Sequence, residues 1–410
     1  MIGTLFWICI GFIVYAYLGY PVIITLMARL IPTKKYPEIE IIPHITLIIA
    51  AYNEALVINE KINNSLALDY PSDKLQIIVV ADGSDDETPD IVRGYADYGV
   101  TLLYDPPRRG KAAAINRAVQ VSNGEILVFS DANNHYVSNV LKKLIIPFAD
   151  PKVGATSGSK RISNQGSQLG VSEGLYWRYE SFIKRQETRL GCCTGVAGEI
   201  LAVRHTLFEP LPENIINDDF YIAMCLIRRG YNIIFVPDAW SLEPISLSAF
   251  DERVRRTRII AGRYQALRLA HRILPIGRPF LFWQSISHKF IRPLVPFAML
   301  GALVTNILVV FIPSQTLIWF WMNSFSSIDW VLLLLQILFY MMAFIGHKFS
   351  WTGRLKTLLY LPTFLVNSNL TAINGLWFYL SGRQTNLWQR VPRHELNLQD
   401  QQGLHHPEDE

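Results

Sequence analysis

Acidic side chains follow three apolar segments of this chain, and carboxylates in such positions can bind a cation or accept a proton. The segments are Ile45–Ala51, Leu75–Val80 and Ile126–Ser130. The acids that follow them are Glu54, Asp82 and Asp131. Short runs of branched and aromatic residues predict buried strands, and open α/β sheets bind ligands beyond the carboxyl ends of their strands. We therefore expect the three acids at one edge of a sheet.

Further charged residues have the types and positions that binding of a diphosphate requires. Asp218 and Asp219 open a predicted helix, and Lys111 follows Arg108-Arg109-Gly110. Six arginines crowd the segment after Pro244, namely Arg253, Arg255, Arg256, Arg258, Arg263 and Arg268.

Each motif alone also has a purely structural explanation. Ser84 and Glu87 have the spacing of a capping box, and Asp218 and Asp219 are favoured in a first helical turn.

Together, the acids and arginines are what transfer of a sugar from a nucleotide diphosphate needs. A divalent ion and arginines can neutralise the leaving diphosphate, and hard oxygen ligands such as Asp131 suit Mg²⁺ or Mn²⁺. A carboxylate at a helix start can serve as the base for the acceptor hydroxyl.

The composition indicates a membrane enzyme. Hydrophobic residues make up 50% of the 410 residues, mean hydropathy is +0.21, and the excess lies at the two ends of the chain. The formal net charge of +4 gives no reason to expect nucleic acid as a partner. Neither the phosphate-loop template nor a G-x-G-x-x-G motif occurs in the sequence, so a dinucleotide-dependent redox enzyme is not expected. The four cysteines lack zinc-site or disulfide spacing and fit a reducing, cytosol-facing compartment.

Residues 1–31 are predicted to be an uncleaved transmembrane anchor. No charged side chain occurs from Ile2 to Ala28, which exceeds the roughly 20 apolar residues that a spanning helix needs. Arg29, Lys34 and Lys35 follow, and basic residues on this side of a span place the next domain in the cytoplasm.

Residues 44–245 are predicted to form one α/β domain. Strand and helix patterns alternate from Ile45 to Ser130, which implies a largely parallel sheet with helices on both faces. The other predicted elements are helices over 54–68, 87–98, 111–122, 173–189 and 217–229, and strands over 101–104 and 200–203. The second half of the domain continues through 153–157 and ends at 231–237.

The rest of the chain is predicted to be membrane-associated. Residues 246–291 are expected to be an arginine-rich segment with an interfacial helix at Trp283–Arg292. Residues 292–381 are expected to form membrane helices, with spans at Pro296–Ile312 and Ile328–Ile345. Residues 382–410 are expected to be a polar tail. Pro362 and several asparagines interrupt the third apolar stretch, Leu358–Leu380, and basic residues flank both of its ends. A full crossing would violate the positive-inside rule at one flank. A crossing and a re-entrant or interfacial placement both stay open, and the second leaves the tail in the cytoplasm.

The chain resembles glycosyltransferase family 2, in the membrane-embedded branch that includes hyaluronan, cellulose and poly-N-acetylglucosamine synthases. The matching motifs are Ala51-Tyr52-Asn53-Glu54, Asp82-Gly83-Ser84-Asp85-Asp86-Glu87-Thr88, Gly110-Lys111-Ala112-Ala113-Ala114-Ile115-Asn116, Asp131-Ala132-Asn133 and Asp218-Asp219. They follow the family order over Ile45 to Arg268. Jointly they are highly specific for the family and weakly specific for the sugar.

The resemblance implies a GT-A (Rossmann-like) fold that binds a UDP-sugar. Asp82 would contact the uracil or the neighbouring nucleotide, and Ala51, Tyr52 and Glu54 would line the same pocket. Lys111 would approach the uridine or the diphosphate.

The resemblance also implies a metal site and a base. Asp131 would face the ribose and the diphosphate bound to Mg²⁺ or Mn²⁺, with Asn133 as the second protein ligand of the metal. Asp219, in the Asp218-Asp219 pair, would be the catalytic base, and the anomeric carbon would be inverted by direct displacement.

Three motifs depart from the family pattern. The D-x-D motif reads Asp131-Ala132-Asn133, so an amide oxygen replaces the second carboxylate and brings less charge to the metal. The usual D-D-G-S motif reads Ala81-Asp82-Gly83-Ser84, with one acid instead of two. The Q-x-x-R-W motif of processive synthases aligns best with Glu252–Arg256, and Arg253–Thr257 is the rival register.

The arginine-rich segment therefore has two interpretations. Arg255 and Arg256 would clamp the diphosphate of the donor, or they would attract anionic lipid headgroups. In the better register Arg256 stands where the family has an acceptor-stacking Trp, so processive synthesis is in question.

We expect a membrane-bound inverting glycosyltransferase, multi-pass in the plasma (inner) membrane, with a cytoplasmic catalytic domain. It would transfer a hexose or N-acetylhexosamine from a UDP-sugar to a growing polysaccharide or glycolipid. The alternatives are single-sugar transfer to a lipid-linked acceptor and a catalytically silent membrane-bound binding subunit. Membrane lipid is an expected partner, nucleic acid is not, and accessory subunits are left open.

Overall fold

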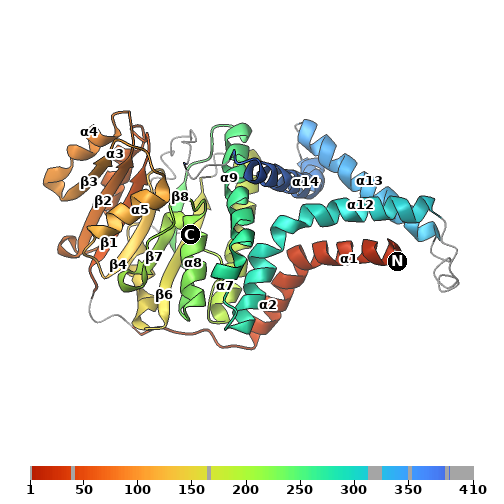
Figure 1. Ribbon diagram of the computed structural model, residues 1–410, viewed down its shortest axis with the longest axis horizontal. Coiled ribbons are helices and arrows are strands. Elements are labelled where there is room, and N and C mark those ends of the chain that lie inside the picture. Colours follow the sequence, from red (N-terminus) through yellow and green to blue (C-terminus); the bar gives the residue numbers. More distant parts are fainter. Residues whose placement is uncertain are drawn as a thin grey trace.

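The computed structural model describes residues 2–37, 42–163, 168–312, 326–349, 353–383 and 387. An α/β region forms one end of the molecule, and long helices from both ends of the sequence extend from its other side (Figure 1). The predicted polar tail at 382–410 lies almost entirely outside the described residues.

Eight strands form one sheet in the described residues, in the order β3-β2-β1-β4-β7-β6-β8-β5. Their bounds are β1 Ile45–Ala51, β2 Leu75–Asp82, β3 Val100–Asp105, β4 Ile126–Asp131, β5 His135–Tyr136, β6 Val153–Ile162, β7 Leu201–Arg204 and β8 Asn232–Glu243. Strands β1 to β4 pair in parallel, and so do β6 and β8. Strand β7 runs antiparallel to both of its neighbours, and β5 runs antiparallel to β8. The sheet is therefore mixed, and it is parallel in the half that carries the predicted acids.

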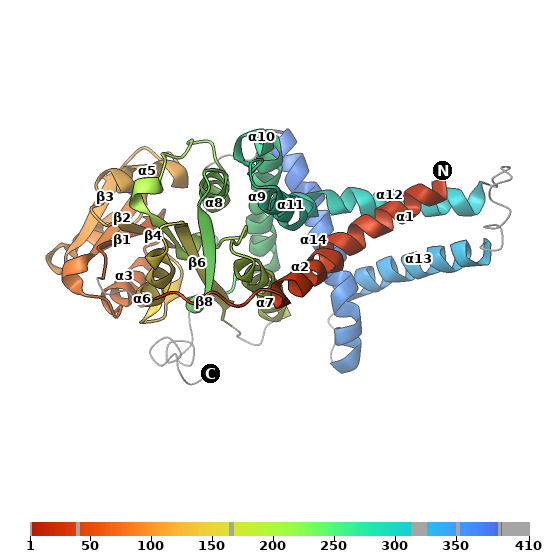
Figure 2. The same cartoon turned by 90° about the horizontal axis from the view of Figure 1, so that it is seen from below.

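Helices cover both faces of the sheet because its central strands are apolar on both faces. In β1, Leu47 and Ile49 pack into one core, whereas Ile48 packs into the other. The helices of this region are α3 Ile58–Leu66, α4 Thr88–Arg93, α5 Lys111–Gln120, α6 Val140–Ile145, α7 Gln168–Arg189 and α8 Asp218–Arg228. Figure 2 shows α3 and α6 on one side of the sheet and α5 and α8 on the other.

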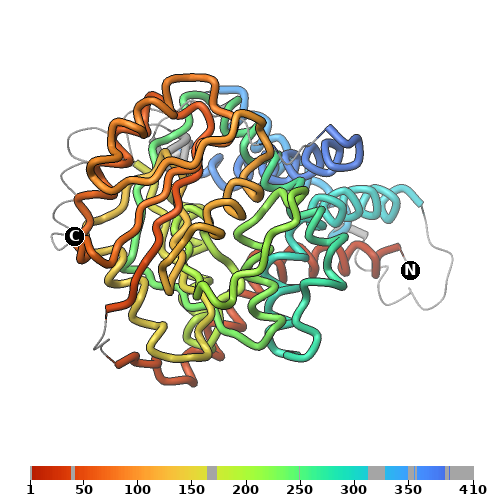
Figure 3. The backbone as a smooth tube through the Cα atoms, turned by 60° about the vertical axis from the view of Figure 1, so that its left-hand side comes forward, coloured from red at the N-terminus to blue at the C-terminus, as the bar shows by residue number. Residues whose placement is uncertain are grey.

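Three helical stretches in the described residues are long and apolar enough to cross a membrane, namely Ile2–Arg29, Pro279–Phe311 and Ile328–Lys348. They contain α1 Ile2–Val14, α2 Tyr20–Arg29, α11 Pro279–Ser285, α12 Val295–Phe311 and most of α13 Ser326–Lys348. The N-terminal and C-terminal helices lie on the same side of the molecule, as the backbone trace shows (Figure 3). The structure thus joins the two apolar ends of the sequence into one helical region.

Helix α14, Gly353–Leu380, is continuous through Pro362 and runs across the direction of α12 and α13 (Figure 2). It packs on α9, Ala249–Arg268, which is followed by the short helix α10, Ala270–Ile273. A Cβ atom at Gly375 would lie 2.7 Å from Cγ2 of Ile260, so a glycine allows the close approach of α14 and α9. The two predicted placements of α14, a full crossing and a re-entrant or interfacial one, both stay predictions.

Candidate active site

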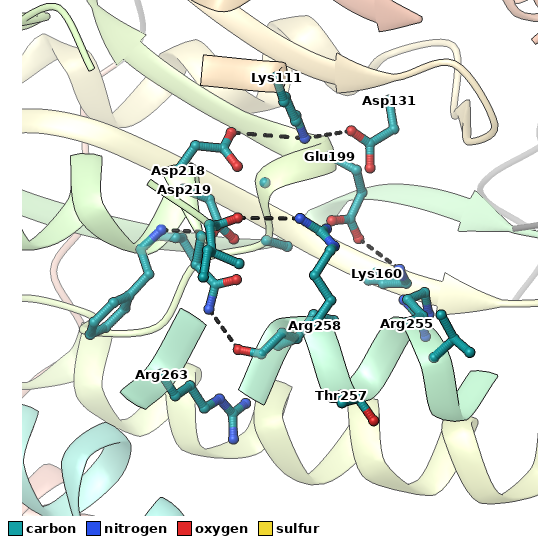
Figure 4. Close-up of a pocket in the computed structure, with 18 of the residues that line it drawn as sticks. Lys111, Asp131, Lys160, Glu199, Asp218, Asp219, Arg255, Thr257, Arg258 and Arg263 are labelled. Carbon is teal, nitrogen blue, oxygen red and sulfur yellow. Dashed lines mark hydrogen bonds and ion pairs between the residues drawn. The ribbon is translucent and has the colours of Figure 1, made fainter. Parts of the chain in front are cut away.

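A cavity of about 750 Å³ lies beyond the carboxyl ends of β1 and β4. Its walls come from the sheet, from α7 and α8, and from the membrane-proximal helices α9 and α14. Figure 4 shows the charged residues of the cavity converging from these elements. Residues from distant parts of the sequence thus face one space.

Lys111 links the acids of two elements. It is the first residue of α5, directly after Gly110, whose φ of 97° favours glycine. Its Nζ lies 2.6 Å from Oδ1 of Asp131 and 3.8 Å from Oδ2 of Asp218. Burial would lower the pKa of Lys111, but the carboxylates of Asp131, Asp218 and Asp219 outweigh burial and raise it. Lys111 is therefore a cation at the centre of the acids.

Asp218 and Asp219 occupy the first turn of α8, as predicted, where the helix dipole favours negative charge. The backbone N–H of Phe220 donates to Asp219 at 2.7 Å. Burial, followed by the charge of Asp218, raises the pKa of Asp219 to about 6, and Lys111 opposes the shift. Asp219 can therefore take up a proton close to neutral pH.

The turn after β4 holds Asp131 and Asn133 at the cavity wall. The next residue, Asn134, is fully buried and fixes this turn. Its Oδ1 accepts hydrogen bonds from Ser130 at 3.0 Å and from Lys61 at 3.2 Å, and its Nδ2 donates to the carbonyl of Glu199 at 2.9 Å. The turn is thus tied to Glu199, another residue that lines the cavity.

A divalent ion fits Asp131 and Asn133 only with help from a substrate. Within the described ranges, no three His, Cys, Asp or Glu side chains are arranged to hold a metal. Asp131 is partly exposed, and both residues offer hard oxygen atoms to the cavity. Mg²⁺ commonly binds to one or two carboxylates together with substrate phosphates. The donor set therefore fits an ion that is shared with a diphosphate.

Asp82 lies behind the turn that begins α5, and its predicted contact with the uracil or the neighbouring nucleotide stays a prediction. It is fully buried, and its carboxylate accepts hydrogen bonds from the backbone N–H groups of Arg109 and Gly110 at 3.2 and 2.7 Å and from Arg117 at 3.1 Å. Among the described residues, those lining the cavity do not include Asp82. Asp82 thus fixes the turn that starts α5 and so positions Lys111.

The other predicted nucleotide residues divide between the cavity and its surroundings. Glu54 lines the cavity, whereas Ala51 is buried at the end of β1. The guanidinium of Arg108 lies 3.5 Å from the ring centroid of Tyr52. Neither Ala51 nor Tyr52 belongs to the cavity lining in the described part of the chain. The predicted contacts of Ala51 and Tyr52 with a nucleotide stay predictions.

Arg255 lines the cavity, Arg256 is not among the described lining residues, and acids pair with both arginines. Nε of Arg255 lies 2.9 Å from Glu252, and Nε of Arg256 lies 2.6 Å from the same carboxylate. Each arginine also lies 3.5 Å from Glu173. Their charges are largely compensated within the protein, so the predicted clamp on a diphosphate requires these ion pairs to open.

Arg258 is a site residue that the sequence placed only within the arginine-rich segment. Its side chain points toward the acids (Figure 4), and it donates to the carbonyl of Ile216 at 3.3 Å. Burial lowers the pKa of Arg258, and the nearby charges of Asp218, Asp131 and Asp219 oppose the shift. A guanidinium remains protonated in proteins. The sequence does place Arg258 three residues after Arg255, so both side chains lie on one face of the helix. This spacing could have identified Arg258 as a site residue.

Another part of the cavity lining combines aromatic and charged side chains. Tyr176 and Trp177 of α7 line it, and Nζ of Lys160 lies 5.1 Å from the ring centroid of Trp177. Lys160 also pairs with Glu199 at 3.3 Å and with Glu243. Flat apolar rings beside polar groups are suited to a sugar, which presents both kinds of surface.

Comparisons with known proteins show which family part of this chain resembles. Residues 46–209 match the model of the family described as Glycosyl transferase family 2. Poly-beta-1,6-N-acetyl-D-glucosamine synthase of Staphylococcus aureus (strain COL) is 30% identical over 233 residues, which cover 54% of this chain and 56% of that protein. Probable glycosyltransferase YdaM of Bacillus subtilis (strain 168) is 27% identical over 227 residues, which cover 50% of this chain and 51% of that protein. The chain spans about half the length of the curated relatives it matches.

A solved structure shares the fold. The mannosyltransferase PcManGT from Pyrobaculum calidifontis, in complex with GDP-Man and Mn²⁺, matches with a TM-score of 0.67 and 24% identity. The match covers 92% of this chain and 99% of that chain. The predicted GT-A fold is confirmed by this likeness.

Proposed function

We propose that the protein is a membrane-bound inverting glycosyltransferase, on the premise that residues 46–209 form a glycosyl transferase family 2 domain. It transfers a hexose or N-acetylhexosamine from a UDP-sugar to a growing polysaccharide or glycolipid. The main support for the proposal is that Asp131, Lys111, Asp218 and Asp219 line one cavity and lie close together. The name of the Staphylococcus aureus relative supports N-acetylglucosamine as the first sugar to test.

The acids and cations of the cavity have separate tasks in this reaction. Asp219 accepts the proton of the acceptor hydroxyl, whose oxygen attacks the anomeric carbon from the face opposite the diphosphate. The bond from that carbon to the diphosphate oxygen breaks, and UDP leaves. Lys111 and Arg258 lie where they can offset the negative charge that develops on the leaving diphosphate, and such preorganised charges lower the barrier.

Asp131 and Asn133 would hold the Mg²⁺ or Mn²⁺ ion together with the diphosphate. The ion supplies positive charge that stabilises the leaving group. Lys111 already lies 2.6 Å from Asp131. It therefore compensates the charge of Asp131 before the donor arrives and remains beside the diphosphate afterwards.

The membrane helices support an acceptor that is associated with the membrane. Asn374 and Phe378 of α14 and several residues of α9 line the same cavity as the acids. An acceptor anchored in lipid can therefore reach Asp219 along the surface of these helices. This arrangement fits a catalytic domain on the cytoplasmic face of the plasma membrane.

Single-sugar transfer to a lipid-linked acceptor is the second candidate. The observation that favours it is Arg256, which stands at the position of the family's acceptor-stacking Trp and pairs with Glu252 and Glu173. Arg256 has no aromatic ring, and two acids already bind its guanidinium. It therefore cannot stack on the sugars of a growing chain as a Trp would.

One assay separates the candidates. Purified protein in detergent is mixed with lipid extract, Mg²⁺ or Mn²⁺, and radiolabelled UDP-glucose, UDP-N-acetylglucosamine or GDP-mannose, and the products are sized. Long labelled chains support polysaccharide synthesis, and lipids carrying one labelled sugar support the second candidate. No transfer from any donor would contradict both and favour the silent binding subunit.

A further inference from the structure

A group of buried charged and aromatic side chains joins the membrane helices to the catalytic domain. We call it the junction cluster, and its members are Tyr20, Glu180, Glu187, His288, Lys289 and Arg292. Tyr20 begins α2, the two glutamates lie on α7, and the other three lie in the segment between α11 and α12. Figure 1 shows α2 beside α7, where the helices from the membrane region reach the α/β region.

Glu187 is the centre of one half of the cluster. It is fully buried, and it accepts a hydrogen bond from the hydroxyl of Tyr20 at 2.5 Å. The same oxygen lies 2.7 Å from Nδ1 of His288. Burial would raise the pKa of Glu187, but His288 and the hydrogen bonds outweigh burial and lower it. Glu187 is therefore ionised and bound to both membrane-associated segments.

Glu180 is the centre of the other half, two helical turns before Glu187. It lies 3.2 Å from Nε2 of His288 and 2.8 Å from Nζ of Lys289, and it also pairs with Arg292. Burial opposes ionisation, but Lys289 and Arg292 hold the pKa of Glu180 well below its usual range. His288 thus bridges the two glutamates and makes the cluster one network.

The cluster reaches the cavity through residues 194–199, which we call the active-site loop. Glu187 accepts the backbone N–H of Thr194 at 2.8 Å and its hydroxyl at 3.1 Å. A Cβ atom at Gly195 would lie 2.9 Å from Nζ of Lys289, and one at Gly198 would lie 2.9 Å from Cβ of Asp219. One end of the loop therefore rests on the cluster and the other on the proposed base.

We propose that Tyr20 and Glu187 are positioning residues for sugar transfer. Docking of α2 fixes Glu187, Glu187 fixes Thr194, and the active-site loop then holds Asp219 in the geometry for proton uptake. This inference rests on the proposed function, in which Asp219 is the base.

The junction cluster is weak evidence for a gain in stability, because replacing buried ion pairs by packed apolar side chains is often neutral or stabilising. Both membrane-associated segments also contain a π-helical turn at the cluster, Tyr15–Gly19 directly before Tyr20 and Ile286–Phe290 around His288. Such turns occur frequently at functional sites.

The test compares two substitutions that each remove one hydroxyl from the junction. Tyr20→Phe removes the hydrogen bond to Glu187. Tyr15→Phe is the matched control, because its hydroxyl lies 2.7 Å from Oγ of Ser287 and joins the same two segments without the glutamate. Full-length protein is measured for sugar transfer and for hydrogen–deuterium exchange of residues 194–199.

We expect Tyr20→Phe to lower kcat about tenfold, since small losses of positioning slow catalysis strongly, and to leave the KM for the donor unchanged. Exchange of the active-site loop should become about tenfold faster, as expected for easier local opening. Tyr15→Phe should match the wild type in both measurements. Thr194→Ser should retain activity because it keeps the hydroxyl. Thr194→Val removes the hydroxyl and should lose activity.

Equal kcat and equal exchange in the two Tyr variants would overturn the proposal, and so would faster exchange with an unchanged kcat. A wild type that transfers no sugar would instead contradict the proposed function. The exchange comparison would then still decide whether Tyr20 positions the loop.

Discussion

Asp219 has the surroundings that a base acting near neutral pH requires. Burial, followed by the charge of Asp218, raises its pKa to about 6 against the opposing charge of Lys111. A carboxylate with a pKa close to the working pH is ionised in most molecules and still basic enough to take a proton from a hydroxyl. Asp219 should therefore set the lower pH limit of the reaction.

Asp219→Asn should lower kcat by at least about 10²-fold, because an amide cannot accept the proton of the acceptor. In the wild type, kcat should fall tenfold for each pH unit below about 6, since the carboxyl group is then protonated. Transfer of radiolabelled sugar measures kcat, and titration calorimetry measures binding of UDP. Loss of UDP binding in Asp219→Asn would show that the residue belongs to the nucleotide pocket instead.

Arg258 and Arg255 allow a comparison of two arginines on one helix face. Arg258→Gln should lower kcat/KM for the donor about tenfold to 100-fold, because charge-assisted contacts to a diphosphate contribute about 1.5–3 kcal/mol each. Arg255→Gln should chiefly lower the thermal midpoint, because it removes one of the two arginines that pair with the buried acids Glu252 and Glu173. Donor kinetics and thermal unfolding in detergent measure both effects. The opposite pattern would assign the diphosphate to Arg255, as the sequence motif predicts.

Individual residue types predicted most of the charged site but not the direction of every side chain. Asp131, Lys111 and Asp219 follow strands or open helices, and such positions meet at the sheet edge. Asp82 also follows a strand, yet its partners are backbone N–H groups of Arg109 and Gly110, 27 and 28 residues away. No local pattern indicates that this distant turn would bind the carboxylate, so its burial could not be predicted.

At the scale of elements, the short helical turn Gly198–Ile200 sets the position of α8. A Cβ atom at Gly198 would lie 2.9 Å from Cβ and 3.1 Å from Cγ of Asp219. Gly198→Ala should therefore displace Asp219 and lower kcat about tenfold or more. Initial rates at saturating donor measure the loss.

Gly174→Ala is the matched control for this substitution. Gly174 lies within α7, and a Cβ atom there would meet nothing within 4 Å. Replacing a helical glycine by alanine stabilises by roughly 0.5–1 kcal/mol, so the control should keep its activity and melt slightly higher. Normal activity in Gly198→Ala would mean that α8 can shift without consequence for the reaction.

The elements themselves were largely predictable because each has a strong local pattern. The strands predicted around Ile45, Leu75 and Ile126 and the helices beginning at Lys111 and Asp218 all occur. The reversal of β7 was not predictable, since a four-residue apolar strand reads the same in either direction. The continuity of α14 was also hidden, because Pro362 and its asparagines suggest a break that packing against α9 and α13 prevents.

At the scale of the whole molecule, the order of the helices favours one arrangement in the membrane. Ile2–Arg29 leads from the far end of the helical region to the catalytic domain, Pro279–Phe311 leads away from it, and α13 leads back (Figure 1). Helix α14 then starts beside the end of α13, and its last turns line the catalytic cavity at Asn374 and Phe378. Both ends of α14 are therefore expected on the catalytic side, which is the re-entrant or interfacial placement. Basic residues then flank every catalytic-side end, as the positive-inside rule requires.

This arrangement can be tested by labelling single cysteines in a variant whose four native cysteines are replaced. Thr4→Cys and Ile312→Cys lie at the ends of α1 and α12 that are remote from the sheet, so a membrane-impermeant maleimide should label them in intact cells. Lys152→Cys in the catalytic domain, and Leu355→Cys and Ser381→Cys at the two ends of α14, should react only after the cells are permeabilised. Labelling of Ser381→Cys but not of Leu355→Cys in intact cells would mean that α14 crosses the bilayer. Labelling of Lys152→Cys in intact cells would place the catalytic domain outside, where cells do not supply UDP-sugars to it, and would contradict the proposed orientation.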